Sequence, residues 1–479
     1  MNQGSFHEQS DNYQDYDLNL EKKREITDFT STKSRFLMLF LGCCLCLGTY
    51  YVHDNPAPLN LELIDELDIN SVKYNMFYSV YSFPNIFLPL LGGFLIDSFG
   101  VRSLVLISSS FSMLGQLIFA IGVQIRSYPL SLVGRAVYGL GGDNLELAQN
   151  IILIEWFTGK ELSMAIGINT SICFFGAVLN ENLEPILVKY TSVPFTIWIG
   201  FIACLFSLIC SCFVTKLDRK QDPYRNASQI FSSADSEKFK LSDVKTLPLC
   251  YWMLLLNCLM VESIVMCFSN ITSGYLQVRF NFDPVSAGNI MSIVFIVCTI
   301  ASPLVGMIID KIGKRILMLI ISSFMFMIIQ IAFALTPDQN KPILPMIFLG
   351  LNGLAYSTYI TVFWTCIPFI VEEKVIGTAY GGCYSCVNLG FFVIPMLIGY
   401  IQENTSSMHG YLWVNVLLIV LGFIGILTAF VVYRIDINAG RILDSEKPTE
   451  TQQQILTKRG SQDSSDIELV HLANPSNTS

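Results

Sequence analysis

Charged residues are scarce in this sequence. Asp, Glu, Lys and Arg make up only 14% of its 479 residues, whereas soluble domains contain about 25%. The charges that do occur are grouped in short segments, and long uncharged apolar runs lie between them. This distribution excludes an ordinary soluble domain and indicates a chain that buries much of its length in lipid.

Histidine and clustered basic residues are also scarce. The sequence contains four His residues, which are His7, His53, His409 and His471. None of them has a metal-ligating neighbour at helical spacing, and Lys and Arg form no basic patch of the kind that binds nucleic acid. We therefore expect no metal, no cofactor and no nucleic-acid partner. The lack of a metal or acid–base cluster also argues against a membrane enzyme.

Twelve apolar runs are long enough to cross a membrane, which takes about 20 helical residues. The runs cover residues 36–52, 74–96, 103–125, 128–155, 162–186, 191–214, 249–274, 284–309, 316–336, 342–371, 375–401 and 410–433. In lipid, a backbone must satisfy its own hydrogen bonds, so runs of this length form helices. The sequence therefore predicts an all-α membrane protein with twelve transmembrane helices.

A polar stretch in the middle of the chain divides the spans into two sets of six. Residues 215–247 form the predicted linker between an amino-terminal bundle at 35–214 and a carboxy-terminal bundle at 248–434. Polar tails at 1–34 and 435–479 flank the two bundles, and their composition predicts disorder. All of these tails and the linker are expected to lie in the cytosol.

The distribution of Lys and Arg predicts the orientation of the chain in the membrane. The tails and the loops on their side contain 23 of the 29 basic residues. The loops on the opposite side contain five, which are Lys73, Arg126, Lys189, Arg279 and Lys341. Because cytosolic loops are enriched in Lys and Arg, we expect a multi-pass protein with both termini in the cytosol.

A short motif recurs after the second and the eighth span. Segments 93–102 and 306–315 match at a constant offset of 213 residues. The matched positions are Gly93 and Gly306, Asp97 and Asp310, Gly100 and Gly313, and Arg102 and Arg315. Two copies at equivalent places indicate that the two six-helix halves are homologous.

The chemistry of the motif suits a gate at the cytosolic edge. Its first glycine permits close helix approach, and its second permits a tight turn with positive φ. Each aspartate is predicted to face the positive start of a helix in the opposite half, Asp97 near Gly377 and Asp310 near Leu162. Arg102 and Arg315 supply the counter-charge on the same side.

The repeated loop resembles the signature loop of the major facilitator superfamily. The segment from Arg135 to Gly141 in the fourth span is similar to that family's RxxxGxG motif. The resemblance covers residues 36–433 and implies two pseudo-symmetric six-helix bundles. It also implies a substrate site near the midplane and transport by rocking of the halves.

Further strings resemble one branch of this family, the lysosomal dipeptide transporters. Among them are the strings at 54–56, 148–150, 156–162 and 388–390, in matching order and spacing. The resemblance implies a uniporter that exports dipeptides from the lysosome lumen to the cytosol across the lysosomal membrane. It also implies a homodimer and a glycosylated single-span lysosomal partner.

Ionisable residues inside the spans are the candidate substrate-binding residues, because burying a charge in a membrane is costly. The fourth span contains Arg135, Asp143 and Glu146, and the seventh contains Glu262. The alternative interpretation is a structural pair between Arg135 and a carboxylate. Glu181 and Glu184 of the fifth span are expected to reach lumenal water.

Two positions depart from the dipeptide branch. Asp143 follows Gly141 and Gly142, where the branch has a carboxylate suited to a peptide amino group. Phe174 and Ser273 stand where the branch has basic residues that would bind a substrate carboxylate. This excess of acid predicts a substrate with a free amino group. A sugar, an organic acid or an amino acid remains an alternative substrate, and a non-transporting receptor or scaffold an alternative function.

Overall fold

The computed structural model describes residues 34–91, 100–157, 160–220, 247–338, 343–371, 376–405, 407–441 and 443. Every regular element in these segments is helical. The first half contains α2 (Ser34–His53), α3 (Asn60–Leu67), α4 (Ser71–Asn85), η1 (Pro89–Leu91), α6 (Val101–Gln124), α7 (Tyr128–Trp156), α8 (Lys160–Tyr190) and α9 (Val193–Arg219). The second half contains α11 (Leu249–Phe280), α12 (Pro284–Met291), α13 (Ile293–Ile312), α14 (Arg315–Leu335), α15 (Leu344–Ile370), α16 (Ile376–Glu403) and α17 (Ser407–Asn438).

Ten of the described helical segments are long and apolar enough to cross a membrane. The tenth of these, for example, covers His409–Asn438 within α17. Helices α4 and α7 occupy the two remaining predicted spans. Helix α4 has only 15 residues, and α7 carries Arg135, Asp143 and Glu146 within its length. The short length of α4 and the charged residues of α7 explain why hydropathy alone marks these two helices less clearly.

The second predicted span is not one continuous helix. Helix α4 ends at Asn85, and the single 3-10 turn η1 follows at Pro89–Leu91. Pro84 and Pro89 lack the backbone N–H that an uninterrupted helix needs, which accounts for the break. The eighth span is interrupted similarly at Ser292, between α12 and α13.

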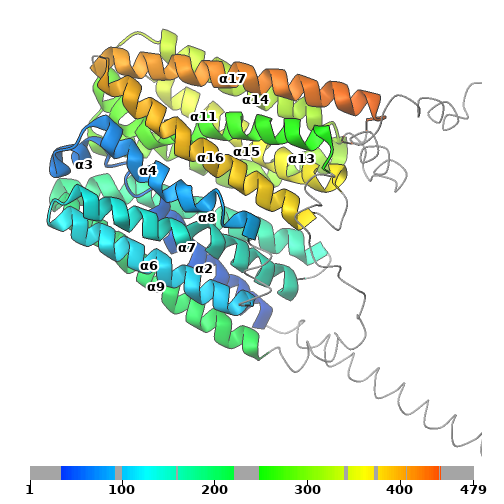
Figure 1. Cartoon of the computed structure of the whole chain (residues 1–479), viewed down its shortest axis with the longest axis horizontal. Helices are drawn as coiled ribbons and strands as arrows, with labels where there is room; N and C mark the ends of the chain where they lie inside the picture. The colour runs from blue at the N-terminus through cyan, green and yellow to red at the C-terminus, as the bar shows by residue number, and fades with distance from the viewer. Residues whose placement is uncertain are drawn as a thin grey trace, which may run out of the picture.

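The two halves lie side by side, with their long helices roughly aligned (Figure 1). The short helix α3 marks one end of the molecule, which we call the α3 end. The start of α2 and the end of α17 lie at the opposite end, which we call the terminal end (Figure 1). The halves meet where α4 packs against α16 and where α8 packs against α12 and α13.

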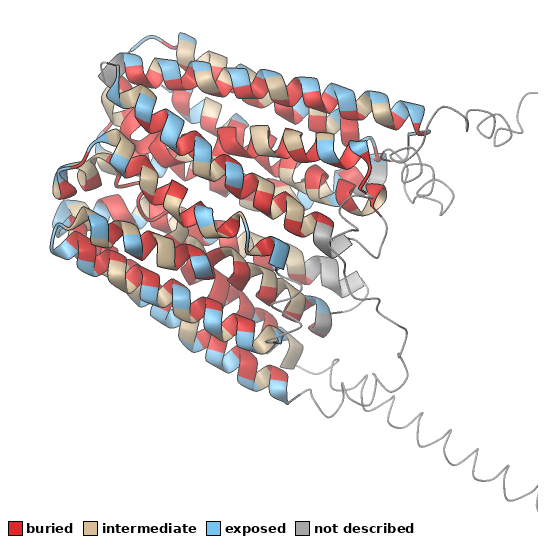
Figure 2. Ribbon diagram, in the orientation of Figure 1, coloured by how far each residue is buried: buried red, intermediate tan, exposed pale blue. Residues whose placement is uncertain are grey.

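The helices turn apolar side chains outward. Figure 2 shows exposed residues along the outer faces and buried residues between the helices. The exposed positions include large apolar side chains such as Phe40, Ile300 and Phe430. Polar side chains such as Gln116, Asn257 and Glu181 are buried in the interior instead. This arrangement matches a lipid-facing surface around a partly polar interior.

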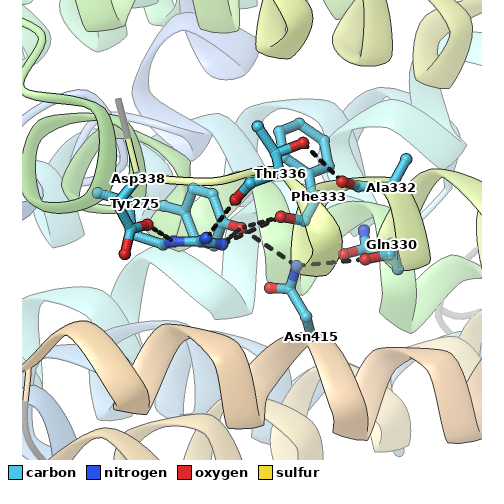
Figure 3. Close-up of polar contacts among 8 residues, drawn as sticks. Tyr275, Gln330, Ala332, Phe333, Thr336, Asp338 and Asn415 are labelled. Carbon is cyan, nitrogen blue, oxygen red and sulfur yellow. Dashed lines mark hydrogen bonds and ion pairs between the residues drawn. The ribbon is translucent and has the colours of Figure 1, made fainter. Parts of the chain in front are cut away.

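A cluster of polar contacts fastens the α3 end of the second half, and Figure 3 labels Tyr275, Phe333, Thr336, Asp338 and Asn415 in it. Arg279, in the last turn of α11, donates to the Phe333 carbonyl at 3.0 Å and to the Thr336 carbonyl at 2.8 Å. Its Nε lies 2.7 Å from Asp338 Oδ1. The Arg279 guanidinium also donates to the Tyr275 hydroxyl at 2.5 Å, and Asn415 of α17 lies 3.2 Å from the same hydroxyl. Arg279 therefore ties α11 to the end of α14 and is buried rather than free in a loop.

Candidate functional site

Asp143 lies at the boundary between the halves and contacts both. The Tyr81 hydroxyl of α4 donates to Asp143 Oδ1 at 2.6 Å, and the Asn388 amide of α16 donates to Oδ2 at 2.9 Å. The side chain is partly exposed rather than buried. Asp143 therefore joins α4 and α7 of the first half to α16 of the second, where a solute between the halves could reach it.

Glycines on α7 allow Tyr81 to approach this carboxylate. A Cβ atom on Gly142 would lie 2.5 Å from the Tyr81 hydroxyl, so a side chain there would force the phenol to move. A Cβ on Gly139 would meet the Tyr81 backbone carbonyl. The glycines that follow Arg135 thus let α4 lie directly on α7, so that the phenol reaches Asp143.

Glu146 lies one helical turn beyond Asp143 on the same face of α7. The Tyr50 hydroxyl of α2 donates to Glu146 Oε2 at 2.8 Å, and the side chain is partly exposed. Tyr384 of α16 lies within electrostatic range of both Glu146 and Asp143. These two acids, with their tyrosine and asparagine neighbours, form the acidic part of the candidate site.

Arg135 is in a different environment from the two acids of its helix. Its side chain is 0% exposed, and it donates to the carbonyls of Val52 at 3.3 Å and His53 at 3.0 Å. Four aromatic rings lie 5.4–6.0 Å from the guanidinium, those of Tyr78, Tyr81, Phe119 and Tyr138. A cation at the C-terminal end of α2 is favoured by the helix dipole, and the rings add cation–π attraction. In the described structure Arg135 forms no ion pair with Asp143 or Glu146.

Glu262 lies on α11, in the second half. Its side chain is 5% exposed, and Tyr356 of α15 and Cys298 of α13 lie near it. No hydrogen bond connects it to the Asp143 network within the described part of the chain. The structure thus brings Asp143 and Glu146 together and places Arg135 and Glu262 in separate surroundings.

Glu181 and Glu184 of α8 do not reach water in this conformation, contrary to the sequence prediction. Both side chains are 0% exposed, as is the neighbouring Asn180. Asn55 donates to Glu184 Oε1 at 2.5 Å. The prediction was wrong because α8 packs against α12 and α13 of the other half, which cover its inner face. The presence of charge in a span was the only sequence signal for these residues.

Phe174 and Ser273, which stand where the dipeptide branch has basic residues, contact neutral groups. Phe174 stacks on Phe295 of α13, with ring centroids 6.0 Å apart, and lies against Tyr356. Ser273 donates to the Pro58 carbonyl at 3.1 Å, at the α3 end. Neither position offers positive charge to a substrate. The excess of acidic over basic residues that the sequence predicted is therefore also present in the folded interface between the halves.

The residues of the repeated motif are only partly described. Gly93 and Asp97 lie outside the described residues, and Asp310, Gly377 and Leu162 are described only as part of the backbone of their helices. The predicted contacts of the two aspartates therefore stay a prediction.

The second glycine of each motif copy behaves as predicted. Gly100 has φ of 74° and Gly313 has φ of 66°, which confirms the predicted turns with positive φ. The first glycine was expected to permit close helix approach. Among the described residues a Cβ on Gly306 would lie 4.0 Å from Thr361 Cγ2, an ordinary contact, and the expected close approach stays a prediction.

Each motif arginine donates hydrogen bonds to a residue at or beyond the end of the last helix of its own half. Arg102 pairs with Asp218 of α9, and Trp156 Nε1 donates to the same carboxylate at 2.7 Å. Arg315 donates to the Leu443 carbonyl at 3.2 Å and lies 4.2 Å above the Phe369 ring. Sequence reasoning did not identify the hydrogen-bond partners Asp218 and Leu443, which lie more than 100 residues away from their arginines in the chain.

No metal site is formed by the described residues. They contain no group of three or more His, Cys, Asp or Glu side chains placed to hold a metal ion.

The fold and the repeated loop define the class of protein. The sequence matches the Major Facilitator Superfamily over residues 38–381 and 253–462. The chain therefore belongs to the Major Facilitator Superfamily, and it is a multi-pass membrane transporter of that family's twelve-helix fold. The predicted fold class is confirmed.

Its relatives narrow the class to one branch. The chain is 32% identical over 413 residues to the lysosomal dipeptide transporter MFSD1 of Homo sapiens, which covers 84% of this chain and 86% of that relative. Identity to the Mus musculus protein of the same name is 34% with the same coverage. The similarity to this branch that the sequence strings predicted is thus confirmed.

Solved structures support the fold independently of sequence. A D-xylose–proton symporter superimposes with a TM-score of 0.65 at 15% identity, covering 84% of this chain and 97% of that chain. A POT family transporter in complex with 5-aminolevulinic acid gives a TM-score of 0.63 at 11% identity, covering 82% and 96%. At such low identity these structures establish the architecture and carry no information on substrate.

Proposed function

We propose that this chain transports dipeptides from the lysosome lumen to the cytosol by alternating access. The relatives named as lysosomal dipeptide transporters support both the substrate class and the membrane. The distribution of basic residues supports an orientation with the α3 end toward the lumen and both termini in the cytosol. Resemblance to the branch supports uniport, a homodimer and a glycosylated single-span partner.

The observation that carries the proposal is the position of Asp143 between the halves. Its two oxygens accept hydrogen bonds from Tyr81 and Asn388, which belong to opposite halves. A protonated α-amino group is a stronger partner for a carboxylate than a neutral amide, because Coulomb attraction between two opposite charges adds to the hydrogen bond. A peptide amino group would displace Asn388 and couple substrate binding to the contact between the halves. Glu146 would accept a further bond one turn away.

The carboxylate end of the peptide has no dedicated cation at the positions that the branch uses. Phe174 and Ser273 are neutral and already engaged with Phe295 and the Pro58 carbonyl. Amide and hydroxyl donors at the interface, such as those of Asn388 and Tyr384, are the groups available for this role. We therefore propose that neutral and basic dipeptides bind better than acidic ones.

The test is competition uptake in proteoliposomes. Matched dipeptides with a lysine, an alanine or a glutamate side chain should compete in that order. Asp143→Asn should weaken binding roughly tenfold or more, because a hydrogen bond to a charged group contributes about 1.5–3 kcal/mol. Asp68→Asn, at an exposed turn of the α3 end, is the matched control and should leave uptake unchanged. Equal competition by the glutamate peptide would contradict the electrostatic argument.

A small amine or amino acid is the second candidate substrate. The same acid-rich interface favours it, because Asp143 and Glu146 need only a cationic head group and not a peptide bond. If no dipeptide competes but a basic amino acid or a simple amine does, the substrate class changes while the role of Asp143 stays.

A further inference from the structure

Glu181 of α8 is a fully buried acid without a hydrogen-bond donor. Its side chain is 0% exposed, and neither Oε1 nor Oε2 has a partner among the described residues. Glu184, one turn further along α8, is equally buried but accepts a hydrogen bond from Asn55. The amide oxygen and the amide nitrogen of the adjacent Asn180 side chain also lack hydrogen-bond partners in the described structure. A negative charge on Glu181 would therefore have no compensation from polar groups.

The charged groups around Glu181 add no compensation either. The charged neighbour is Asp54, another acid, whose carboxylate lies 2.9 Å from His53 Nδ1. On α13 the titratable neighbour is Cys298, and α12 contains no titratable side chain. On α7, Arg135 donates to backbone carbonyls of α2 instead. The charged residues of α9 all lie in its last four positions, at the terminal end.

Glu181 is buried by contact between the two halves. Gly288 of α12 packs so closely on the Glu181 backbone carbonyl that a Cβ on this glycine would clash with it. Helix α8 belongs to the first half, while α12 and α13 belong to the second. Rocking of the halves during transport would separate these helices at the α3 end. Glu181 would then exchange an apolar interface for water.

We propose that Glu181 is a proton-binding site that must be occupied before the halves close at the α3 end. An ionised carboxylate without donors is strongly disfavoured in an apolar interior, whereas the neutral acid is tolerated. A proton suits the site better than a metal ion, because the described residues offer no group of three acidic, His or Cys ligands. The carboxyl gains the proton while the α3 end is open to water and keeps it on closing.

The consequence for transport rests on the proposed function. If the α3 end faces the lysosome lumen, the acidic lumen loads Glu181 and favours closure on that side. Proton binding itself does not depend on which solute is carried, so it can be tested without any substrate.

The test is hydrogen exchange of the α12 segment, Pro284–Met291, in the full chain reconstituted in lipid. Exchange rates are corrected for the intrinsic effect of pH, and α14 serves as an internal reference. We expect protection of α12 to fall as pH rises, by up to about tenfold per pH unit for a single linked proton. Glu181→Gln mimics the neutral acid and should keep α12 protected at every pH.

Glu184→Gln is the matched control, because this residue is on the same helix and equally buried, but its Oε1 has a donor in Asn55 of its own half. Only its Oε2 lacks a partner in the described structure. This variant should retain the pH dependence of the wild type. Two results would overturn the proposal: α12 protection in the wild type that does not change with pH, or a pH dependence that survives Glu181→Gln. The first of these results is measured on the wild-type protein and does not depend on the folding of a variant. If the wild-type protein takes up no dipeptide but its α12 exchange still depends on pH, the proposed substrate is rejected and the proposed proton site is retained.

Discussion

At the scale of single residues, charges on one helix have different surroundings. Arg135 and Asp143 both belong to α7, but one is fully enclosed and the other faces the boundary between the halves. Arg135 meets carbonyl oxygens and aromatic rings of its own half, which stabilise its charge without any substrate. Asp143 has neutral donors that a cationic ligand can displace. The structure therefore favours a structural role for Arg135 and a ligand-facing position for Asp143.

Arg135→Met should lower stability far more than substrate affinity. The change leaves the His53 carbonyl without a donor, and a buried unsatisfied group costs about 1–3 kcal/mol. The Val52 carbonyl loses one of its two donors and keeps the Asn55 N–H. The thermal midpoint in detergent should fall clearly, while the KM for a neutral dipeptide should change little. Arg126→Ala is the control, because Arg126 is 71% exposed in its pair with Glu66 and such pairs contribute about 0–1 kcal/mol. An unchanged midpoint with a tenfold higher KM would place Arg135 in the substrate site.

At the scale of elements, the short helix α3 and the segment before it close one end of the molecule. The Tyr74 hydroxyl lies 2.9 Å from the carbonyls of both Pro56 and Asn270, and Ser273 donates to the Pro58 carbonyl. These contacts connect the loop before α3 to α4 and to α11 of the other half. Closure of the α3 end thus depends on a lid that is short and only partly apolar.

Docking of α3 should weaken as pH rises. Burial raises the pKa of Glu62, on α3, above its usual 4.5, and its Oε2 has no partner among the described residues. Because the pKa is raised in the docked state, the stabilisation is full below the usual value. It is lost as pH rises through the raised one. Hydrogen exchange of Asn60–Leu67 should therefore be slower at acidic than at neutral pH, and Glu62→Gln should abolish the difference. Glu66→Gln, on the same helix but paired with Arg126, should preserve it.

At the scale of the whole molecule, two similar halves meet along pseudo-symmetric helix pairs. Helix α4 packs on α16 and α8 packs on α13, so the second span meets the eleventh and the fifth meets the eighth. The repeated motif follows the second and the eighth spans, at one end of each of these pairs. Changes in this motif should therefore alter the balance between the open and closed arrangements of the halves.

Asp97→Ala should slow transport with little change in substrate affinity. Loss of a partly buried helix-end charge contact is worth up to about 2 kcal/mol, which shifts a two-state population roughly thirtyfold. Dipeptide uptake should show a lower maximal rate at nearly unchanged KM. Asp310→Ala should act in the same way by pseudo-symmetry, and Asp68→Asn, which removes an exposed charge and keeps the left-handed turn, should have no effect. A large affinity loss at unchanged maximal rate would contradict the predicted gate.

The sequence by itself determined the helices and the repeat. The length and apolarity of a run are local properties, so each predicted span overlaps a described helix. The second span overlaps α4 and η1, and the eighth overlaps α12 and α13. The turns at Gly100 and Gly313 were also predictable, because a tight turn with positive φ favours glycine at that position. Homology of the halves followed from one constant offset, without knowledge of any contact.

Only the tertiary structure decided which charges face the boundary between the halves. Asn388, the partner of Asp143, lies 245 residues further along the chain, and no local pattern could identify it. The burial of Glu181 depends on α12 and α13, and the isolation of Arg135 depends on rings from three different helices. A side chain's charge state and accessibility follow from everything packed around it, and in a helical membrane protein those neighbours come from distant parts of the sequence.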